Sequence, residues 1–185
     1  MNLFILHTNP ILAAQYQCTA HKRKMGSEAC NMLMWPLKRL GLKLPDTQKG
    51  DEVRLSHENH PATKWINNSE ENYHWAVIHA KELLEEYARL YKRRHYADVY
   101  MDFIITNLNK IKFGSVYQIP FARCFGDFSE NLIGVRDPVD AYRQFYWLDK
   151  EKFARWEHLY AIPDFWPKDQ KYIDKAFKDG IYTKR

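Results

Sequence analysis

Residues 73–91 read YHWAVIHAKELLEEYARLY, and this pattern establishes the fold class of the 185-residue chain. Apolar side chains return every three or four positions, as they do on one face of an α-helix. They are Tyr73, Ala76, Val77, Ala80, Leu83, Leu84, Tyr87, Leu90 and Tyr91. We therefore predict a long amphipathic helix whose apolar stripe faces the core, and we expect Asn68 and Glu71 to form a capping box at its start.

The composition outside this segment also favours helices. Only 7 glycines and 8 prolines are present, which is little turn-forming chemistry for a fold of many short strands. Further helices are predicted at residues 10–35, 96–110, 137–156 and 170–178, with a polar loop at 41–58 and an irregular stretch at 113–134. Residues 1–185 are thus expected to form one all-α domain, a helical bundle with a long loop after the first helix.

The cysteines and the first residues bear on where the protein resides. Three cysteines without a C-x-x-C pair do not make a disulfide framework, and they fit a reducing compartment. The apolar start at residues 1–6 ends at His7, short of a secretion signal, and no apolar run reaches the length of a membrane span. We expect a cytoplasmic protein without a membrane partner.

Basic residues are clustered along the chain. Lys and Arg exceed Asp and Glu by 28 to 23, and an ordinary solvated surface would account for that net charge of +5. The cations gather, however, at residues 21–24, 38–39, 92–95 and 168–175, with tyrosine and tryptophan close by. Clustered cations beside aromatic rings suit phosphate contacts and base stacking, so we expect DNA, most simply a duplex, as the large partner. The candidate contact residues are Lys22, Arg23, His60, Arg93, Arg94, Tyr142, Arg143, Tyr146 and Lys150.

The predicted helix at residues 137–156 carries cations and aromatic rings together. Arg143 and Lys150 are seven positions apart and share a face, with Tyr146 between them. This arrangement can clamp a phosphate and stack a base. The other interpretation is an aromatic helix packed in the core with its two cations solvated, and the sequence leaves both open.

The predicted first helix carries the candidate catalytic residues. His21, Lys24 and Glu28 fall on one side of it, beside an apolar edge. A carboxylate, a lysine and a histidine in this register can do acid–base work, and the lysine can serve as an amine nucleophile. The alternative is that Lys24 and Glu28 form a plain i,i+4 pair on a solvated face.

Other chemistries find less support. His57 and His60 form an H-x-x-H pair, but no zinc-site spacing accompanies them, and His74 and His79 diverge around their helix. No Walker loop, dinucleotide fingerprint or G-x-S-x-G motif is present. We therefore expect neither a metal nor a cofactor.

The order of these features resembles the pyrimidine-dimer DNA glycosylase (endonuclease V) superfamily, especially its small bacterial and phage members. MNLFILH at residues 1–7 precedes a first helix with Lys24 and Glu28 in register, and NHP at 59–61 opens the helical run that ends with EEY at 85–87. The resemblance covers about the first 95 residues. Two later segments, AYRQFY and KFARW, are similar to uncharacterised phage proteins of this length.

The resemblance implies an all-α protein that binds duplex DNA, flips out a damaged or modified base and cleaves its N-glycosidic bond, as a glycosylase or AP lyase does. In that superfamily the N-terminal amine of a threonine attacks the sugar and a glutamate on the first long helix assists, a role that falls to Glu28. This chain begins Met1-Asn2, so the amine is that of Met1 or Asn2, or Lys24 replaces it as a Schiff-base lysine, or the activity has been lost.

Two other functions stay open at this point. One is a phage-encoded binding module without catalysis, which blocks a host factor or a nucleic acid in the host cytoplasm. The other is a transferase that modifies DNA bases on the same scaffold. The sequence does not name a protein partner.

Overall fold

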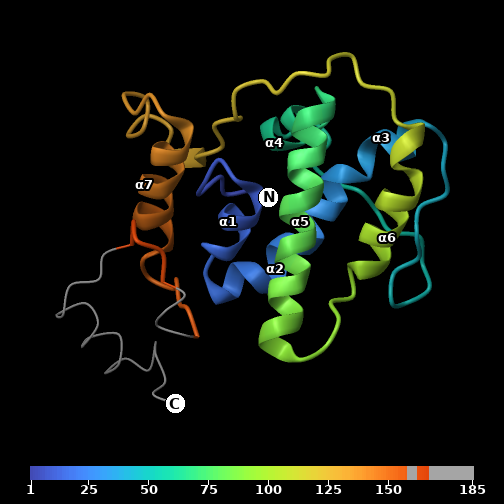
Figure 1. Cartoon of the computed structure of the whole chain (residues 1–185), viewed down its shortest axis with the longest axis horizontal. Helices are drawn as coiled ribbons and strands as arrows, with labels where there is room; N and C mark the ends of the chain where they lie inside the picture. The colour runs from blue at the N-terminus through green and yellow to red at the C-terminus, as the bar shows by residue number, and fades with distance from the viewer. Residues whose placement is uncertain (158–161, 167–185) are drawn as a thin grey trace.

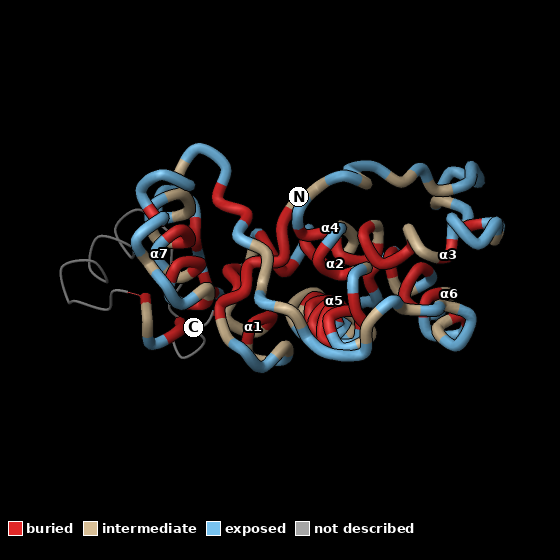
Figure 2. Tube along the Cα trace, turned by 90° about the horizontal axis from the view of Figure 1, so that it is seen from above, coloured by how far each residue is buried: buried red, intermediate tan, exposed pale blue. Residues whose placement is uncertain are grey.

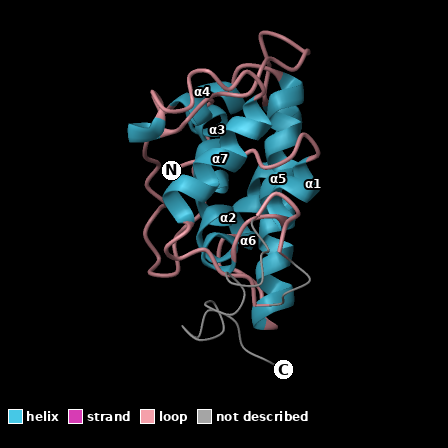
Figure 3. Ribbon diagram, turned by 90° about the vertical axis from the view of Figure 1, so that its left-hand side faces the viewer, coloured by secondary structure: helices cyan, strands magenta, loops and turns pink. Residues whose placement is uncertain are grey.

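The computed structural model describes residues 1–157 and 162–166, and in this part of the chain the fold is all-α, as predicted. Helices are joined by loops alone, and the one β-type pairing among these residues is an isolated bridge between Asp46 and Glu52 (Figures 1 and 3). The predicted helix at residues 170–178 lies outside the described residues.

Helix α5 (Glu70–Tyr91) forms the centre of the fold, and its apolar stripe faces the core as predicted, with Val77, Leu90 and Tyr91 half-buried and the other members buried. Its N-cap is Ser69, whose hydroxyl accepts a hydrogen bond from the Asn72 amide at 3.2 Å. The predicted capping box of Asn68 and Glu71 is therefore wrong. Ser69 has the extended backbone that a cap requires. The Glu71 carboxylate accepts from the backbone amide of Gln118 and not from the start of its own helix.

The long helix predicted at residues 10–35 is instead two helices, and a third begins where the predicted helix was expected to end. They are α1 (Pro10–Gln15), α2 (Thr19–Leu33) and α3 (Trp35–Arg39). Asn9 caps α1, as the Asn-Pro pair predicted. The backbone then becomes extended at Cys18, which separates α1 from α2. The break is held by Gln17, whose side-chain amide donates to the Leu3 carbonyl at 3.0 Å and lies 3.1 Å from His79.

Helices α1, α2, α4 (Pro61–Ile66) and α6 (Asp98–Asn107) are arranged around α5. α2 and α1 pack along it, α4 covers its N-terminal end, and α6 lies beside α2 (Figure 1). Figure 2 shows buried residues gathered where α2, α4 and α5 meet. A single turn of 3-10 helix, η1 (Leu108–Lys110), ends α6 at the predicted position.

Helix α7 (Pro138–Lys150) packs on the other side of the N-terminal segment (Figure 1). Leu3 to Leu6 form no strand but are fully buried, and Phe4 stacks between His21 of α2 and Phe145 of α7. α7 begins at the predicted Asp137 cap and ends six residues before the predicted Trp156, because the chain turns back at Phe153 and Ala154.

The segment between η1 and α7 is irregular as predicted, apart from one 3-10 turn, η2 (Gly126–Phe128). Among the described helices, none combines the length and the apolar composition that would let it cross a membrane.

Candidate functional site

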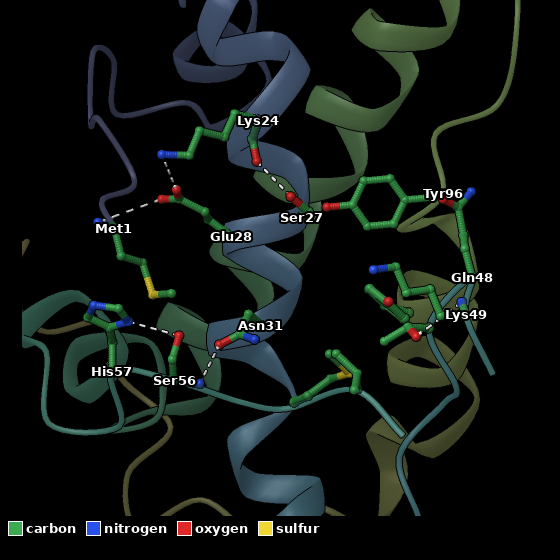
Figure 4. Close-up of a pocket in the computed structure, with 14 residues that line it drawn as sticks. Met1, Lys24, Ser27, Glu28, Asn31, Gln48, Lys49, Ser56, His57 and Tyr96 are labelled. Carbon is green, nitrogen blue, oxygen red and sulfur yellow. Dashed lines mark hydrogen bonds and ion pairs between the residues drawn. The ribbon is translucent and has the colours of Figure 1, made fainter. Parts of the chain in front are cut away.

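A groove with a volume of about 670 Å³ runs over the exposed face of α2 (Figure 4). Its floor is the stretch of α2 that carries Lys24, Glu28 and Asn31. One wall is the loop at residues 41–58, and another is the start of α6. The volume falls in the range of small-ligand sites, which is about 300–1,000 Å³.

Two amines converge on one carboxylate in this groove. Glu28 accepts from the Lys24 ammonium at 2.9 Å and faces the α-amine of Met1 at 3.7 Å (Figure 4). The Glu28 side chain is only 15% exposed, whereas Lys24 is 71% exposed. The structure therefore brings together Lys24 and Glu28, as the helical spacing predicted, and adds the Met1 amine from the N-terminal segment.

Asn2 holds the Met1 amine in place. Its side-chain oxygen accepts from the backbone amides of Leu3 at 2.8 Å and Phe4 at 3.3 Å, and its side-chain amide donates to the Cys124 carbonyl at 2.6 Å. Phe4 has a φ of +51°, which is an unfavourable conformation for an aromatic residue. Its side chain is buried and stacks on His21 and Phe145, and these contacts offset the strain.

His60 stands at the edge of the same site. It caps α4, with Nδ1 accepting from the Ala62 amide at 3.2 Å. Burial lowers its pKa, the Met1 amine and His57 lower it further, and Glu28 opposes them. His60 is thus within electrostatic reach of Met1 and Glu28, although it was predicted as a DNA contact.

The sequence pattern did not indicate that His57 and Asn31 shape the groove. His57 lines it with a left-handed backbone, at a φ of +59°, and its ring lies 6.5 Å from that of His60. Asn31 ties the loop to α2, because its amide accepts from Ser56 at 3.1 Å and donates to Arg54 at 3.3 Å. Asn31 shares the exposed face of α2 with Lys24 and Glu28, because it follows them by seven and three residues, and that spacing was the signal available.

His21, predicted as the third catalytic residue, lies outside the groove. Seven residues separate it from Glu28, which is about 10 Å along a helix. Its side chain is buried, and its Nδ1 lies 2.8 Å from the Tyr146 hydroxyl, which also accepts from the Cys18 backbone amide. Burial, with the charges of Lys150 and Lys24, lowers the pKa of His21 to about 3. This neutral, enclosed imidazole belongs to the core, which corrects the prediction.

Several predicted DNA contacts are also placed in the interior. The Lys22 side chain is 5% exposed and paired with Glu86, so it does not present its charge to a phosphate. Tyr142 and Tyr146 are 1% and 0% exposed, and the Tyr142 hydroxyl donates to the Ala122 carbonyl. Their rings are therefore closed to base stacking, as the alternative of a core-packed helix predicted.

The two cations of α7 are engaged within the protein. Arg143 donates to the Leu6 carbonyl at 3.0 Å and lies over the Phe165 ring. Lys150 pairs with Asp149 and stands over three phenylalanine rings, at 5.4 to 5.6 Å from their centres. They do not form an open phosphate clamp.

The remaining predicted contacts are at the surface. Arg23 is exposed next to Lys24, and Arg93 is exposed while donating to the Tyr87 hydroxyl at 3.2 Å. Arg94 is also exposed, but it pairs with Asp98 and Asp102, which offset its charge. Arg23 and Arg93 both act electrostatically on Tyr91, so they belong to one cationic area at the end of α5.

Among the described residues, no group of three His, Cys, Asp or Glu side chains has the arrangement of a metal site. Comparison of the chain with family models, with curated proteins and with solved structures gives no match.

Proposed function

We propose that this protein acts on damaged or modified bases in DNA, using a primary amine and Glu28 to cleave the N-glycosidic bond. The observation that carries the proposal is the placement of the Met1 and Lys24 amines against the Glu28 carboxylate in an open groove. The resemblance to base-excision glycosylases points to the same pairing of an amine with a first-helix glutamate.

The chemistry needs an amine as nucleophile and a group that moves protons. The neutral amine attacks C1′ of the deoxyribose, forming a nitrogen–carbon bond while the bond to the base breaks. The base leaves with the electron pair of the glycosidic bond and takes a proton from solvent water. Glu28 then moves a proton from the new ammonium to O4′ as the C1′–O4′ bond opens, which leaves a protonated imine.

The two amines differ in how readily they act. Lys24 has the shorter contact to Glu28, but its side chain is free to move in solvent. Met1 is held by the Asn2 contacts, which favours it as the better-positioned amine.

Borohydride trapping tests the proposal, because only an imine is reduced to a stable protein–DNA adduct. We expect a covalent adduct with oligonucleotides that contain an abasic site or a modified base. Glu28→Gln should lower the trapping rate by about a hundredfold or more, while DNA affinity holds or rises. Lys24→Ala removes the adduct if Lys24 is the nucleophile, and blocking the N-terminal amine removes it if Met1 is.

The chain offers a matched control on α5. Lys81 and Glu85 form another i,i+4 pair, 3.9 Å apart and exposed on both sides. Lys81→Ala and Glu85→Gln make the same chemical changes away from the groove, and trapping should be unaffected. If no adduct forms with any of these oligonucleotides, the glycosidic chemistry is refuted. If Glu28→Gln traps as fast as Glu85→Gln, then Lys24 and Glu28 are an ordinary surface pair.

A further inference from the structure

The groove has an aromatic wall that the proposed bond cleavage does not use. Tyr96, two residues before the first residue of α6, is 45% exposed and lines the groove on the opposite side of α2 from the side chains of Met1, Lys24 and Glu28 (Figure 4). Its hydroxyl end is directed toward Ser27 on α2. A half-exposed aromatic ring beside a candidate reaction centre is a surface on which a planar ligand can stack.

The Tyr96 ring is held rigidly by two neighbours. Its centre lies 4.4 Å from that of His95 with the rings tilted by 32°, and 6.1 Å from that of Tyr100 in an edge-on contact. Tyr100 is 6% exposed and His95 is 5% exposed, so both supports are fixed in the core. A ring that is already positioned loses little conformational entropy when a ligand stacks on it.

His95 is itself locked in one state. Its Nδ1 accepts from the Ala97 amide at 3.0 Å, so the other nitrogen carries the proton and donates to the Arg23 carbonyl at 3.2 Å. Burial is the main cause that lowers its pKa, which keeps the ring neutral. The contact also joins Tyr96 to the turn of α2 that carries Arg23 and Lys24.

The charges around the ring favour an anionic ligand. The groove is lined by three cationic groups, the Met1 amine, Lys24 and Lys49, against the single carboxylate of Glu28. Arg23, whose carbonyl accepts from His95, adds exposed positive charge on the neighbouring turn of α2, and the nearby carboxylate of Asp98 is paired with Arg94. A ligand with both a flat ring and a phosphate matches this combination.

We infer that Tyr96 is a base-stacking platform, and that the groove takes a nucleic-acid strand with at least one unpaired base. Within an uninterrupted duplex each base is covered on both faces, so its face reaches Tyr96 only after it leaves the stack. The inference rests on the proposed function for the choice of nucleic acid, but it does not require that Glu28 breaks a bond.

Binding to labelled oligodeoxynucleotides tests the inference. One probe is a duplex with a single bulged base, and the other is the same duplex fully paired. Tyr96→Ala should weaken binding of the bulged probe by about 5- to 100-fold, which is the usual effect of losing one base–aromatic stack. Binding of the paired probe should change little. Tyr96→Phe and Tyr96→Trp should keep the affinity, because they keep the ring face.

Tyr117→Ala is the matched control, since Tyr117 is 78% exposed and does not line the groove. If Tyr96→Ala and Tyr117→Ala bind the bulged probe alike, the stacking platform is refuted. If Tyr96→Phe loses as much as Tyr96→Ala, stacking is also excluded as the cause. Circular dichroism of each variant checks that the helices remain.

The same measurements separate this inference from the bond-cleaving function. A bulge-specific affinity that depends on Tyr96, with no borohydride adduct, supports the platform and refutes the chemistry. If an adduct forms at saturating DNA whether or not Tyr96 is replaced, and the protein shows no preference for the bulged probe, the bond-cleaving chemistry is supported and the stacking platform is refuted. A wild-type protein that binds neither probe at low salt refutes both.

Discussion

Gly26 of α2 faces Leu84 of α5 so closely that a Cβ atom at position 26 would lie 2.8 Å from Leu84 Cδ2 and 3.3 Å from Leu84 Cγ. Since Leu84 is 3% exposed and enclosed by the core, it has little room to move. The two main helices of the fold therefore approach each other at a point where only glycine fits without rearrangement.

This contact makes Gly26→Ala destabilising, although alanine is the better helix former by about 1 kcal/mol. Overpacking a core contact costs about 1–3 kcal/mol, so we expect a net loss of roughly 1 kcal/mol and a melting temperature lower by about 2–4 °C. Thermal and urea unfolding measure it. Gly114→Ala is the control, because nothing lies within 4 Å of the added carbon. Equal stability of the two variants would contradict the close approach.

The buried ion pair of Lys22 and Glu86 predicts an asymmetry between its two partners. Glu86 also accepts from Arg89 at 2.8 Å, whereas the described contacts give the Lys22 ammonium no second acid. Burial alone would raise the pKa of Glu86, but Lys22 and Arg89 together lower it. Glu86→Gln should thus cost about 3–5 kcal/mol by leaving a buried ammonium unpaired, and Lys22→Met should cost clearly less.

Urea unfolding of the two single variants and the double variant checks this asymmetry. The double variant should recover part of the loss, because it removes the unpaired charge. Lys81→Met, on the exposed pair with Glu85, should change stability by about 0.5 kcal/mol or less. A larger loss from Lys22→Met than from Glu86→Gln would contradict the arrangement.

Two buried histidines predict loss of stability in mild acid. Burial lowers the pKa of His21 to about 3 and that of His79 to about 4, from 6.5 in the unfolded chain. Below pH 6.5 the unfolded chain binds protons that the folded protein excludes, so stability is complete above that pH and falls as the pH drops toward the folded values. The slope is up to about 1.4 kcal/mol per pH unit for each histidine.

Urea midpoints between pH 7 and pH 5 measure this slope. His21→Phe removes one of the histidines whose pKa is lowered in the folded protein, and it should make the fall with pH shallower, whatever its effect on stability at pH 7. His74→Asn changes an exposed histidine of α5 and should leave the slope as it is. A slope reduced equally by both changes would show that burial of His21 is not its origin.

The parts of the fold that could be predicted from sequence are those set by local spacing. The stripe of α5, the caps at Asn9 and Asp137, and the pairing of Lys24 with Glu28 each depend on residues a few positions apart. The break before α2 could not be predicted, because Gln17 finds its partners only in the folded protein.

Burial and the site walls depend on the same kind of distant contact. Lys22 looked like a surface cation because its partner, Glu86, is 64 residues away. The Met1 amine reaches Glu28 through an Asn2 contact to Cys124 that spans 122 residues. Tyr96 is next to its support His95 in the sequence, but its place in the groove depends on how α6 packs beside α2.

The exposed arginines at the end of α5 make the last prediction, which concerns the salt dependence of DNA binding. Affinity for a short duplex should fall steeply between low and physiological salt, as expected when cations on the protein displace counterions from phosphates. Arg93 keeps its charge available, since within the described part of the chain it donates to the Tyr87 hydroxyl and forms no ion pair, whereas Arg94 is paired with Asp98 and Asp102. Arg93→Ala should therefore lower affinity equally for all sequences and reduce the slope of log affinity against log salt by about one. Arg94→Ala should have a smaller effect on both quantities, because its charge is already offset. Binding measured at several salt concentrations separates the two variants, and an Arg94→Ala slope that falls as far as that of Arg93→Ala would contradict the role of the aspartates.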